Sequence, residues 1–501
     1  MSGAEVPLTI GRALRSAARK PGKVAIRRGQ EMLTYRDVVV RMDRMAHVAA
    51  AHFRLERGDR AMLIAPNVPR YLEVVAGLAE AGVIVALVNP ALSSAEIDQI
   101  LNDCEPRLVI LDPSVAYEPP RGIVPLTLGR AYESLLDQAC SAPFRSSARE
   151  DDPFALAYTS GTTGRPKGVL LSHRSRTLTF MAMAAEYACF GPDDHFLAIA
   201  PMCHGAGFAF AAAALAFGGQ VTLFDGGDPE RLLRRLAYGD ISGVFVVPTH
   251  IARLSKLSPA VLDQHRQHRL RTIISNAAAL PQNAKEFALE QFGPGLLHET
   301  YGSTEAGIVT NIRPDDILAK PGSVGLPFAN MEVDLRLADG TSAPPGEIGE
   351  LFSRGPTGFS GYWNRATETN ETIRDGWITV GDLARSDEDG FITILDRIKD
   401  MVVSGGMNVY PREVETAISE LPGVLEVAVV GLPDPEWGER LHAFVVGAGV
   451  AEADIVSHCR ARLAGYKRPR GVTFLDALPR NASGKLLKRE LRSAFAPQPI
   501  D

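Results

Sequence analysis

The chain has 501 residues, which is more than one compact core usually holds and therefore indicates two or more domains. Its composition, 46% hydrophobic and 22% charged with a mean hydropathy near zero, is typical of a soluble globular protein. The net charge of −6 and the absence of a basic run argue against a surface dedicated to nucleic acid.

Cysteine content and the N-terminal residues bear on the compartment. The five cysteines are odd in number, scattered and without a C-x-x-C pair, so they predict neither a disulfide framework nor a zinc site. The apolar run before Arg12 is too short for a secretory signal. Both observations favour a reducing, cytoplasmic location.

Residues 8–112 alternate helical and strand patterns, which predicts βαβ units and a mostly parallel sheet. The expected elements are a helix at 35–52, a strand at 60–65, a helix at 71–81, a strand at 83–89, a helix at 95–104 and a strand at 107–111. Breaks at Asn67-Val-Pro and Asn89-Pro90 follow strands, where ligand-facing loops lie in open α/β sheets. Residues 113–150 have weak periodicity and are expected to connect subdomains.

The stretch 158–169, Tyr-Thr-Ser-Gly-Thr-Thr-Gly-Arg-Pro-Lys-Gly-Val, combines glycines, hydroxyl groups and a lysine. Glycines let the backbone approach a ligand, and the side chains supply the neutral and charged donors that triphosphate oxygens need. Only two residues separate the first two glycines, and the lysine precedes another glycine, so the spacing excludes a Walker loop. We therefore predict a phosphate-holding loop, with a flexible surface loop as the alternative. Its candidate ligand-binding residues are Thr159, Ser160, Gly161, Thr162, Thr163, Gly164 and Lys167.

Residues 196–224 carry no Asp, Glu, Lys or Arg and are numerous enough to span a bilayer. Pro201, His204 and several glycines interrupt the stretch, and alanine makes up much of its apolar content. We expect a strand, a turn, a buried helix and a strand rather than a membrane span. Further apolar strands are expected at 221–224, 244–247 and 272–275.

Two later stretches carry carboxylates in chemically suggestive positions. Residues 298–306 read His-Glu-Thr-Tyr-Gly-Ser-Thr-Glu-Ala, and a carboxylate with a hydroxyl beside a glycine suits Mg²⁺ bridged to phosphates. Asp382 and Arg397 follow, and a carboxylate is the usual acceptor for ribose hydroxyls. Taken singly, these two residues are more often a salt bridge.

The sequence pattern changes near Asp396. A glycine-rich, β-rich region at 346–390 precedes it, and a helix beginning at Pro411, strands at 424–430 and 444–446 and a helix at 453–463 follow. We therefore expect a large α/β domain with a β-rich region at 1–396 and a small α+β domain at 397–501. The chain closes on Leu-Pro-Arg-Asn-Ala-Ser-Gly-Lys485, where a lysine beside a glycine reaches an active site as a point charge or is simply solvated.

These five ordered motifs resemble the signatures of the adenylate-forming superfamily, which contains acyl- and aryl-CoA synthetases, luciferases and the adenylation domains of peptide synthetases. The resemblance covers nearly the whole chain and implies an acyl-CoA synthetase-like fold that uses ATP, Mg²⁺ and coenzyme A. Catalysis would rest mainly on in-line positioning and electrostatic stabilisation, and the small domain would act as a rotating lid.

The resemblance also implies a function for individual residues. Glu305 would bind Mg²⁺, Thr304 the α-phosphate, and Tyr301 would stack on adenine. The remaining assignments are adenine partners at Glu299 and Thr300, ribose contacts at Asp382 and Arg397, a hinge at Lys399, a lining of the thiol's approach at Gly405 and Gly406, and neutralisation of charge during adenylation by Lys485.

The acid-binding pocket in relatives is walled by segments that are apolar or small here. They contain Phe208, Ala277, Ala278, Gly302 and Ile308. No Asp stands near Phe208 to pair an amino group, and no Arg marks a second carboxylate, so we predict a monocarboxylic acid with an apolar or aromatic body. His204 is a gate or orienting residue, or else a core histidine. Residues 275–280, Ser-Asn-Ala-Ala-Ala-Leu, depart from the usual Gly-Gly-Ala/Ala-Pro-Leu pattern, which weakens any transfer of substrate identity.

Residues 465–470, Gly-Tyr-Lys-Arg-Pro-Arg, offer an aromatic ring and three cations, among them Lys467, for the phosphates of CoA, or else form a solvated basic turn. The leading hypothesis is an ATP-dependent carboxylate–CoA ligase whose partners are a small carboxylic acid, ATP and CoA, with a homodimer as one assembly. The alternatives are a stand-alone enzyme that loads a carrier-protein thiol and a nucleotide-binding sensor that has lost catalysis.

Overall fold

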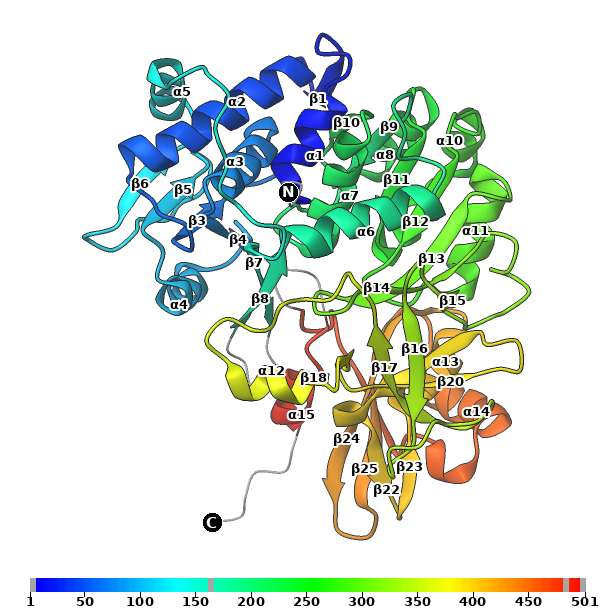
Figure 1. The fold of residues 1–501 in the computed structure, drawn as a ribbon. Helices are drawn as coiled ribbons and strands as arrows, with labels where there is room; N and C mark the ends of the chain where they lie inside the picture. The colour runs from blue at the N-terminus through cyan, green and yellow to red at the C-terminus, as the bar shows by residue number, and fades with distance from the viewer. Residues whose placement is uncertain (1–5, 161–165, 481–485, 496–501) are drawn as a thin grey trace. The chain divides into compact units, whose positions relative to one another are not determined.

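The computed structural model describes residues 6–160, 166–480 and 486–495 (Figure 1). Packing divides the chain into two compact units, Met1–Val333 with Ser353–Thr379, and Asp334–Phe352 with Val380–Asp501. The predicted border at 396/397 lies inside the second unit. Because a hinge is defined by rotation and not by packing, Lys399 stays a prediction.

The helices and strands alternate through most of the first unit. The α-helices are α1 (Ile10–Ala17), α2 (Tyr35–His47), α3 (Pro69–Glu80), α4 (Ser94–Cys104), α5 (Arg130–Gln138), α6 (His173–Glu186), α7 (Gly205–Ala216), α8 (Pro229–Ala237), α9 (Pro248–Leu254), α10 (Pro259–Gln264), α11 (Gln282–Phe292), α12 (Ala366–Thr372), α13 (Pro411–Ser419), α14 (Glu452–Arg462) and α15 (Lys488–Phe495). The strands are β1 (Val24–Arg28), β2 (Glu31–Thr34), β3 (Arg60–Ile64), β4 (Ile84–Val88), β5 (Leu108–Leu111), β6 (Val124–Thr127), β7 (Pro153–Ser160), β8 (Pro166–Ser172), β9 (His195–Ala198), β10 (Gln220–Leu223), β11 (Gly243–Val246), β12 (Thr272–Ser275), β13 (Leu297–Ser303), β14 (Gly307–Ile312), β15 (Leu326–Pro327), β16 (Glu332–Arg336), β17 (Gly349–Arg354), β18 (Ile373–Arg374), β19 (Trp377–Ile378), β20 (Asp382–Ser386), β21 (Ile392–Arg397), β22 (Val402–Ser404), β23 (Met407–Val409), β24 (Val424–Asp434), β25 (Gly438–Gly447) and β26 (Gly471–Phe474). A π-helix at Val48–His52 extends α2, and 3₁₀ helices lie at Ile398–Asp400 and Gly465–Lys467.

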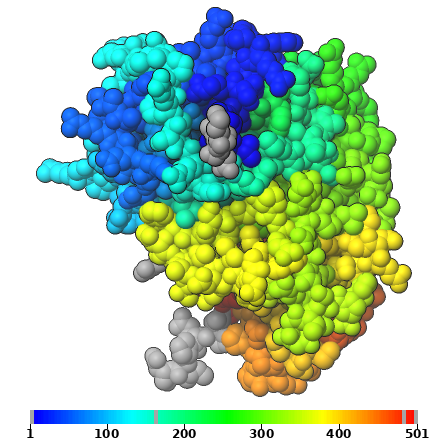
Figure 2. Space-filling view, in the orientation of Figure 1, coloured from blue at the N-terminus to red at the C-terminus, as the bar shows by residue number. Residues whose placement is uncertain are grey.

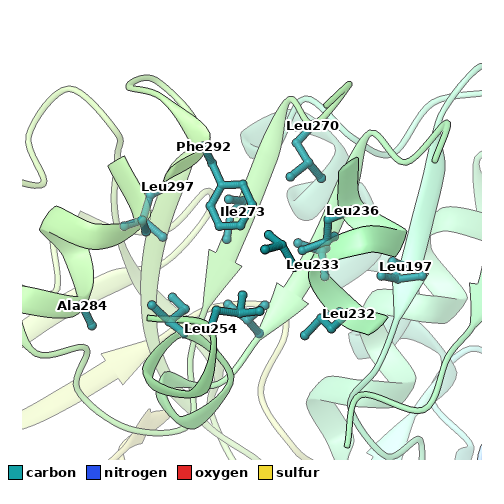
Figure 3. Close-up of a cluster of buried hydrophobic side chains, with 14 of the residues drawn as sticks. Leu197, Leu232, Leu233, Leu236, Leu254, Leu270, Ile273, Ala284, Phe292 and Leu297 are labelled. Carbon is teal, nitrogen blue, oxygen red and sulfur yellow. The ribbon is translucent and has the colours of Figure 1, made fainter. Parts of the chain in front are cut away.

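One sheet of the first unit has the strand order β15-β14-β13-β12-β11-β9-β10-β1-β2. Its central strands β9, β11 and β12 are buried along their whole length, which explains why they read as continuous apolar runs. Helices α8, α9 and α11 bury leucine, isoleucine and phenylalanine side chains against one face of this sheet (Figure 3). On α7, Phe210 stacks on Phe196 and Phe245 of the sheet, with ring centroids 6.2 and 4.4 Å away.

A second sheet of the first unit has the order β6-β5-β3-β4-β7-β8 and is parallel except for the β7–β8 hairpin. Helix α4 packs on it through Ile97, Ile100 and Leu101. The expectation of a plain connection at 113–150 was incomplete, because β6 and α5 lie there. Only one residue of β6 is buried, and α5 buries only Tyr132 and Leu136, so neither element leaves a strong periodic pattern.

The chain returns to the first unit at residues 353–379. There α12 and the short hairpin β18–β19 follow a segment that pairs with β8. In Figure 2 the yellow surface of this segment borders the teal surface of earlier residues of the same unit.

The second unit is an α+β arrangement, as predicted. Its sheet has the order β23-β22-β25-β24 with β26 on β25, and α13 and α14 cover one face. Helix α13 begins at Pro411 as expected, and Oδ2 of Asp396 accepts a hydrogen bond of 3.0 Å from the backbone N–H of Arg412 in its first turn. Strands β20 and β21 form a separate antiparallel pair in this unit.

The uncharged stretch 196–224 forms strand β9, the buried helix α7 and strand β10, so the expected order is confirmed. Within the described ranges, no helix has both the length and the apolar character needed to cross a membrane.

Candidate active site

Strands β7 and β8 form the hairpin that carries the predicted phosphate loop. Thr159 lies opposite Lys167 and Ser160 opposite Pro166 in the ladder. The residues between them, Gly161, Thr162, Thr163 and Gly164, lie outside the described residues. The ammonium nitrogen of Lys167 is 5.2 Å from the centroid of the Tyr362 ring. The hairpin therefore holds Thr159 and Lys167 side by side at the base of the loop.

The predicted metal-binding stretch is the turn between β13 and β14. Gly302 is needed here, since a Cβ at this position would lie 2.0 Å from the carbonyl oxygen of Gly307. The Ser303 hydroxyl accepts a hydrogen bond of 3.0 Å from the backbone N–H of Ala306 and so closes the turn. Thr304 and Glu305 thus project from a tight, internally bonded turn. Tyr301 precedes it on β13, opposite Thr310.

The Glu305 carboxylate fits a magnesium ion that is shared with phosphates. Its residue is 9% exposed, and Oε1 accepts a hydrogen bond of 2.7 Å from the Tyr362 hydroxyl. Among the described residues, no group of three or more His, Cys, Asp or Glu is placed to hold a metal. Mg²⁺ does not need such a group, because it commonly takes one or two carboxylates and completes its shell with phosphate and water oxygens.

The start of helix α7 lies beside this turn. His204 is the residue before the helix, and a Cβ built on Gly205 would lie 3.7 Å from Cγ2 of Thr304. Burial lowers the pKa of His204 below its ordinary value, so the imidazole is neutral at neutral pH. A neutral imidazole beside the metal-binding turn suits an orienting residue.

The loop after β12 contacts the predicted adenine-binding residues. The side-chain amide of Asn276 donates a hydrogen bond of 2.6 Å to Oγ1 of Thr300 and its oxygen accepts from the N–H of Ala277. Ala277 has a φ of 77°, in the region that favours glycine. Backbone strain of this kind often accompanies functional sites.

The Glu299 side chain is committed to internal contacts. Its carboxylate forms a buried ion pair of 2.6 Å with Lys285 and accepts a hydrogen bond of 2.8 Å from the N–H of Leu280. Any contact from Glu299 to adenine would therefore come from its backbone. The pair instead fixes the loop of residues 275–280 against β13.

The residues predicted to wall the acid pocket have unequal exposure. Phe208 and Ile308 are buried, whereas Ala277 and Ala278 are exposed. The ring of Phe208 lies 5.9 Å from that of Phe154 on β7. Their assignment to the pocket, with that of Gly302, stays a prediction.

In the second unit, Asp382 and Arg397 face each other on β20 and β21. Nε of Arg397 lies 3.1 Å from Oδ1 of Asp382, so the two residues form the salt bridge that was the simpler interpretation. A second oxygen of a bridged carboxylate still accepts hydrogen bonds, and the ribose contact stays a prediction. Lys399 follows in a 3₁₀ helix.

The glycine pair of the second unit forms the tight turn between β22 and β23. Gly405 and Gly406 have φ of 58° and 78°, and a Cβ on Gly405 would lie 2.6 Å from the Trp437 ring. The guanidinium of Arg470 lies over the same ring, 4.1 Å from its centroid. Lys467, by contrast, is held by Glu413 through bonds of 2.7 and 2.8 Å. Lys485 lies outside the described residues.

Sequence reasoning missed four residues that shape the site. Asn67 bridges the loop before α7, donating 2.9 Å to the carbonyl of Ala200 and accepting 2.8 Å from the N–H of Met202. The Asn67-Val-Pro break was the one available signal for it. The others are Asn276, Lys285 and Tyr362, whose partners are distant in the chain and left no local pattern.

Donors for phosphate at the β7–β8 hairpin and a carboxylate suited to magnesium at the β13–β14 turn, on an α/β fold of this topology, define an adenylate-forming enzyme. The description "AMP-binding enzyme" matches residues 14–363, and "AMP-binding enzyme C-terminal domain" matches residues 413–485. The chain belongs to the AMP-binding enzyme family.

Individual relatives cover almost the whole chain. A feruloyl-CoA synthase from Amycolatopsis is 37% identical over 493 residues, which are 96% of this chain and 98% of the relative. The crystal structure of ATP-bound MatB from Rhodopseudomonas palustris is 31% identical, with a TM-score of 0.89 over 98% of this chain and 99% of that chain. The o-succinylbenzoate CoA synthetase MenE from Bacillus subtilis, in complex with its acyl-adenylate intermediate, is 28% identical with a TM-score of 0.87 over 98% and 99%. The expected superfamily and fold are thereby confirmed.

Proposed function

We propose that the protein is an ATP-dependent carboxylate–CoA ligase that activates an apolar or aromatic monocarboxylic acid as acyl-AMP and transfers the acyl group to CoA. The observation that carries the proposal is the fixed turn with Thr304 and Glu305, joined through Tyr362 to Lys167 of the phosphate hairpin. The feruloyl-CoA synthase relative supports an aromatic acid and CoA as acceptor.

In the first half-reaction a carboxylate oxygen attacks the α-phosphorus of ATP, the bond to the β-phosphate oxygen breaks, and pyrophosphate leaves. Mg²⁺ on Glu305, when bound, supplies charge neutralisation at the phosphates. Thr304 donates to the α-phosphate, and Lys167 with the loop hydroxyls orients the leaving pyrophosphate. Lys485 neutralises the negative charge shared by the carboxylate and α-phosphate.

In the second half-reaction the thiol sulfur bonds to the acyl carbon and the bond from that carbon to the AMP oxygen breaks. AMP leaves, and the thiol proton passes to solvent. His204 is neutral and beside the turn, where it orients the acyl group and does not serve as a charged group.

The second unit offers a place for the phosphates of CoA. A cavity of about 340 Å³ is lined by Val456, Cys459, Arg460, Gly465, Arg468, Pro469 and Arg470. Arg468 is anchored through Nε to the carbonyl of Leu463 at 2.9 Å, while Arg470 stacks on Trp437. Guanidinium groups held in this way are suited to phosphate. This arrangement moves the CoA assignment from Lys467, which Glu413 holds, to the neighbouring arginines.

The acid is expected to be held by shape and by burial of its body. Phe208 and Ile308 offer apolar walls, and ferulate and other aromatic acids are the first candidates. A screen should also include medium-chain fatty acids, which present a similar apolar body.

Lys399 is the proposed hinge about which the second unit turns between the two half-reactions. It lies in the 3₁₀ helix Ile398–Asp400, just after β21. Replacing Lys399 with Pro restricts φ at this point, so acyl-AMP formation and thioester formation should be affected unequally. Normal CoA transfer in this variant would count against the hinge.

The function is tested by incubating the purified protein with ATP, Mg²⁺, CoA and single acids, and identifying the thioester by mass spectrometry. Acyl-CoA formation supports the proposal. Acyl transfer only to a phosphopantetheinylated carrier protein would favour the carrier-loading alternative, and nucleotide binding without turnover would favour the sensor. Gel filtration tests the homodimer. All five cysteines are free thiols, which fits a reducing compartment such as the cytoplasm.

A further inference from the structure

Residues 357–365, here called the strap, are bonded to the metal-binding turn. The hydroxyl of Thr357 donates a hydrogen bond of 3.3 Å to the carbonyl of Ala306. The N–H of Phe359 donates one of 2.7 Å to the carbonyl of Glu305. The backbone of Glu305 is therefore held by the strap independently of its carboxylate.

The same strap is bonded to the strand after the phosphate loop. The N–H of Ser360 donates to the carbonyl of Leu170, and the N–H of Leu170 donates to the carbonyl of Gly361, both at 3.0 Å. The N–H of Trp363 donates to the carbonyl of Gly168 at 2.8 Å. The strap thus extends the edge of β8 by a short antiparallel pairing.

A third anchor ties the strap to the end of α4. Asp103 accepts hydrogen bonds from Nε1 of Trp363 on its carbonyl at 3.1 Å and from Arg365 on Oδ1 at 2.7 Å. Its Oδ2 accepts from the hydroxyl of Tyr158 at 2.8 Å, and Tyr158 lies on the strand before the phosphate loop. Both strands that flank the loop are therefore tied to the strap.

Tyr362 is at the centre of these contacts. Its N–H donates to Oγ1 of Thr369 at 2.9 Å, and its hydroxyl donates to Oε1 of Glu305 at 2.7 Å. Burial and the nearby Glu305 raise the pKa of Tyr362 above its ordinary value, so the hydroxyl remains a donor. The face of its ring lies 5.2 Å from the ammonium of Lys167.

We propose that Tyr362 is a positioning residue for the magnesium–nucleotide complex. By occupying Oε1 it fixes the rotamer of Glu305 and leaves Oε2 for the metal, and its ring sets the direction of Lys167 toward the same phosphates. The inference rests on the proposed function, since it assumes that Glu305 binds the metal. Partners of this kind typically change metal affinity by 10- to 100-fold when removed.

The test measures metal binding and not turnover. Mn²⁺ is titrated into the full-length protein with a non-hydrolysable ATP analogue, and free Mn²⁺ is followed by electron paramagnetic resonance. Tyr362→Phe is expected to weaken Mn²⁺ binding roughly tenfold. Binding of AMP without metal should be unchanged. The matched control is Tyr117→Phe, because Tyr117 donates an equal bond of 2.7 Å to Asp98 away from the site and its loss should leave Mn²⁺ binding unchanged.

A double-mutant cycle separates positioning from a general structural effect. In the Glu305→Gln background, Tyr362→Phe should have no further effect on Mn²⁺ affinity, because the hydroxyl acts through the carboxylate. Equal affinity of Tyr362→Phe and wild type, or fully additive losses in the double variant, would overturn the inference. Should Tyr362→Phe fail to fold, Thr369→Val removes the acceptor of the Tyr362 N–H and should weaken Mn²⁺ binding in the same direction. Failure of the wild type to bind Mn²⁺ with nucleotide would instead reject the proposed function.

Discussion

Tyr362 and Glu305 are 57 residues apart in the chain, yet the hydroxyl of one donates a hydrogen bond of 2.7 Å to the carboxylate of the other. The bond joins the returning segment of the first unit to the β13–β14 turn. Lys167 faces the same tyrosine ring. Groups suited to phosphate and to magnesium are thus organised around one side chain before any ligand binds, which reduces the ordering that binding requires.

Replacing Lys485 with Ala should reduce acid-dependent ATP–pyrophosphate exchange by at least about 100-fold while changing the Kd for ATP by less than about threefold. The reason is that a lysine that neutralises developing charge acts in the transition state and contributes little to ground-state binding. Lys488→Ala, three residues further on, is the control and should exchange normally, since this lysine is paired with Glu415 at 2.7 Å. Equal losses of exchange and binding in Lys485→Ala would contradict its assignment.

Ala277→Gly should raise the free energy of unfolding by about 0.5–1 kcal/mol. A φ of 77° costs an alanine about 1–2 kcal/mol, and only part of this is offset by the greater chain entropy of glycine in the unfolded state. Urea denaturation measures the change. Ala278→Gly provides the comparison, because its φ is not positive and the same replacement there should be neutral or destabilising. A loss of stability in Ala277→Gly would show that the loop is not strained.

Lys285→Met should lower the free energy of unfolding by about 3–5 kcal/mol, because it leaves Glu299 buried without its cation. The double variant Lys285→Met with Glu299→Gln should recover much of this loss, and both effects are measurable by urea denaturation. The surface replacement Lys20→Met should stay within about 0.5 kcal/mol of wild type. A loss below about 1 kcal/mol in Lys285→Met would indicate that water replaces the ammonium group.

Stability should fall between neutral pH and about pH 5. Burial lowers the pKa of His298 to about 4, whereas an unfolded histidine has a pKa near 6.5. The unfolded state therefore binds more protons in this range, so the contribution of His298 is present above about pH 6.5 and is lost as pH falls toward 4. At about pH 5 the loss is on the order of 2 kcal/mol. Urea denaturation at two pH values should show a smaller difference for His298→Gln than for wild type, and an unchanged difference would contradict the assignment.

The sequence predicted the elements whose burial is periodic or continuous. Strand β3, helix α4 and the strand–helix–strand order of residues 196–224 appear close to their expected bounds, because each buries a full apolar face. The edge strand β6 and helix α5 were missed, since few of their side chains are buried. The position of Thr304 and Glu305 in one turn also followed from the motif.

Contacts between distant segments could not be predicted in this way. Nothing near Tyr362 in the sequence indicates Glu305, and nothing near Lys285 indicates that Glu299 is its partner. Such pairs arise from the order of strands in the sheet and leave no local periodicity. The ion pair of Asp382 and Arg397 was foreseen as the simpler interpretation, whereas the occupation of Lys467 by Glu413 was not.

The most direct test of the account is acid-dependent ATP–pyrophosphate exchange by the purified protein in the absence of CoA. The account predicts that an aromatic acid such as ferulate promotes exchange, that exchange requires Mg²⁺, and that Glu305→Gln reduces it by at least about 100-fold. No exchange with any apolar or aromatic acid, in a preparation that binds ATP, would contradict the formation of an acyl-AMP.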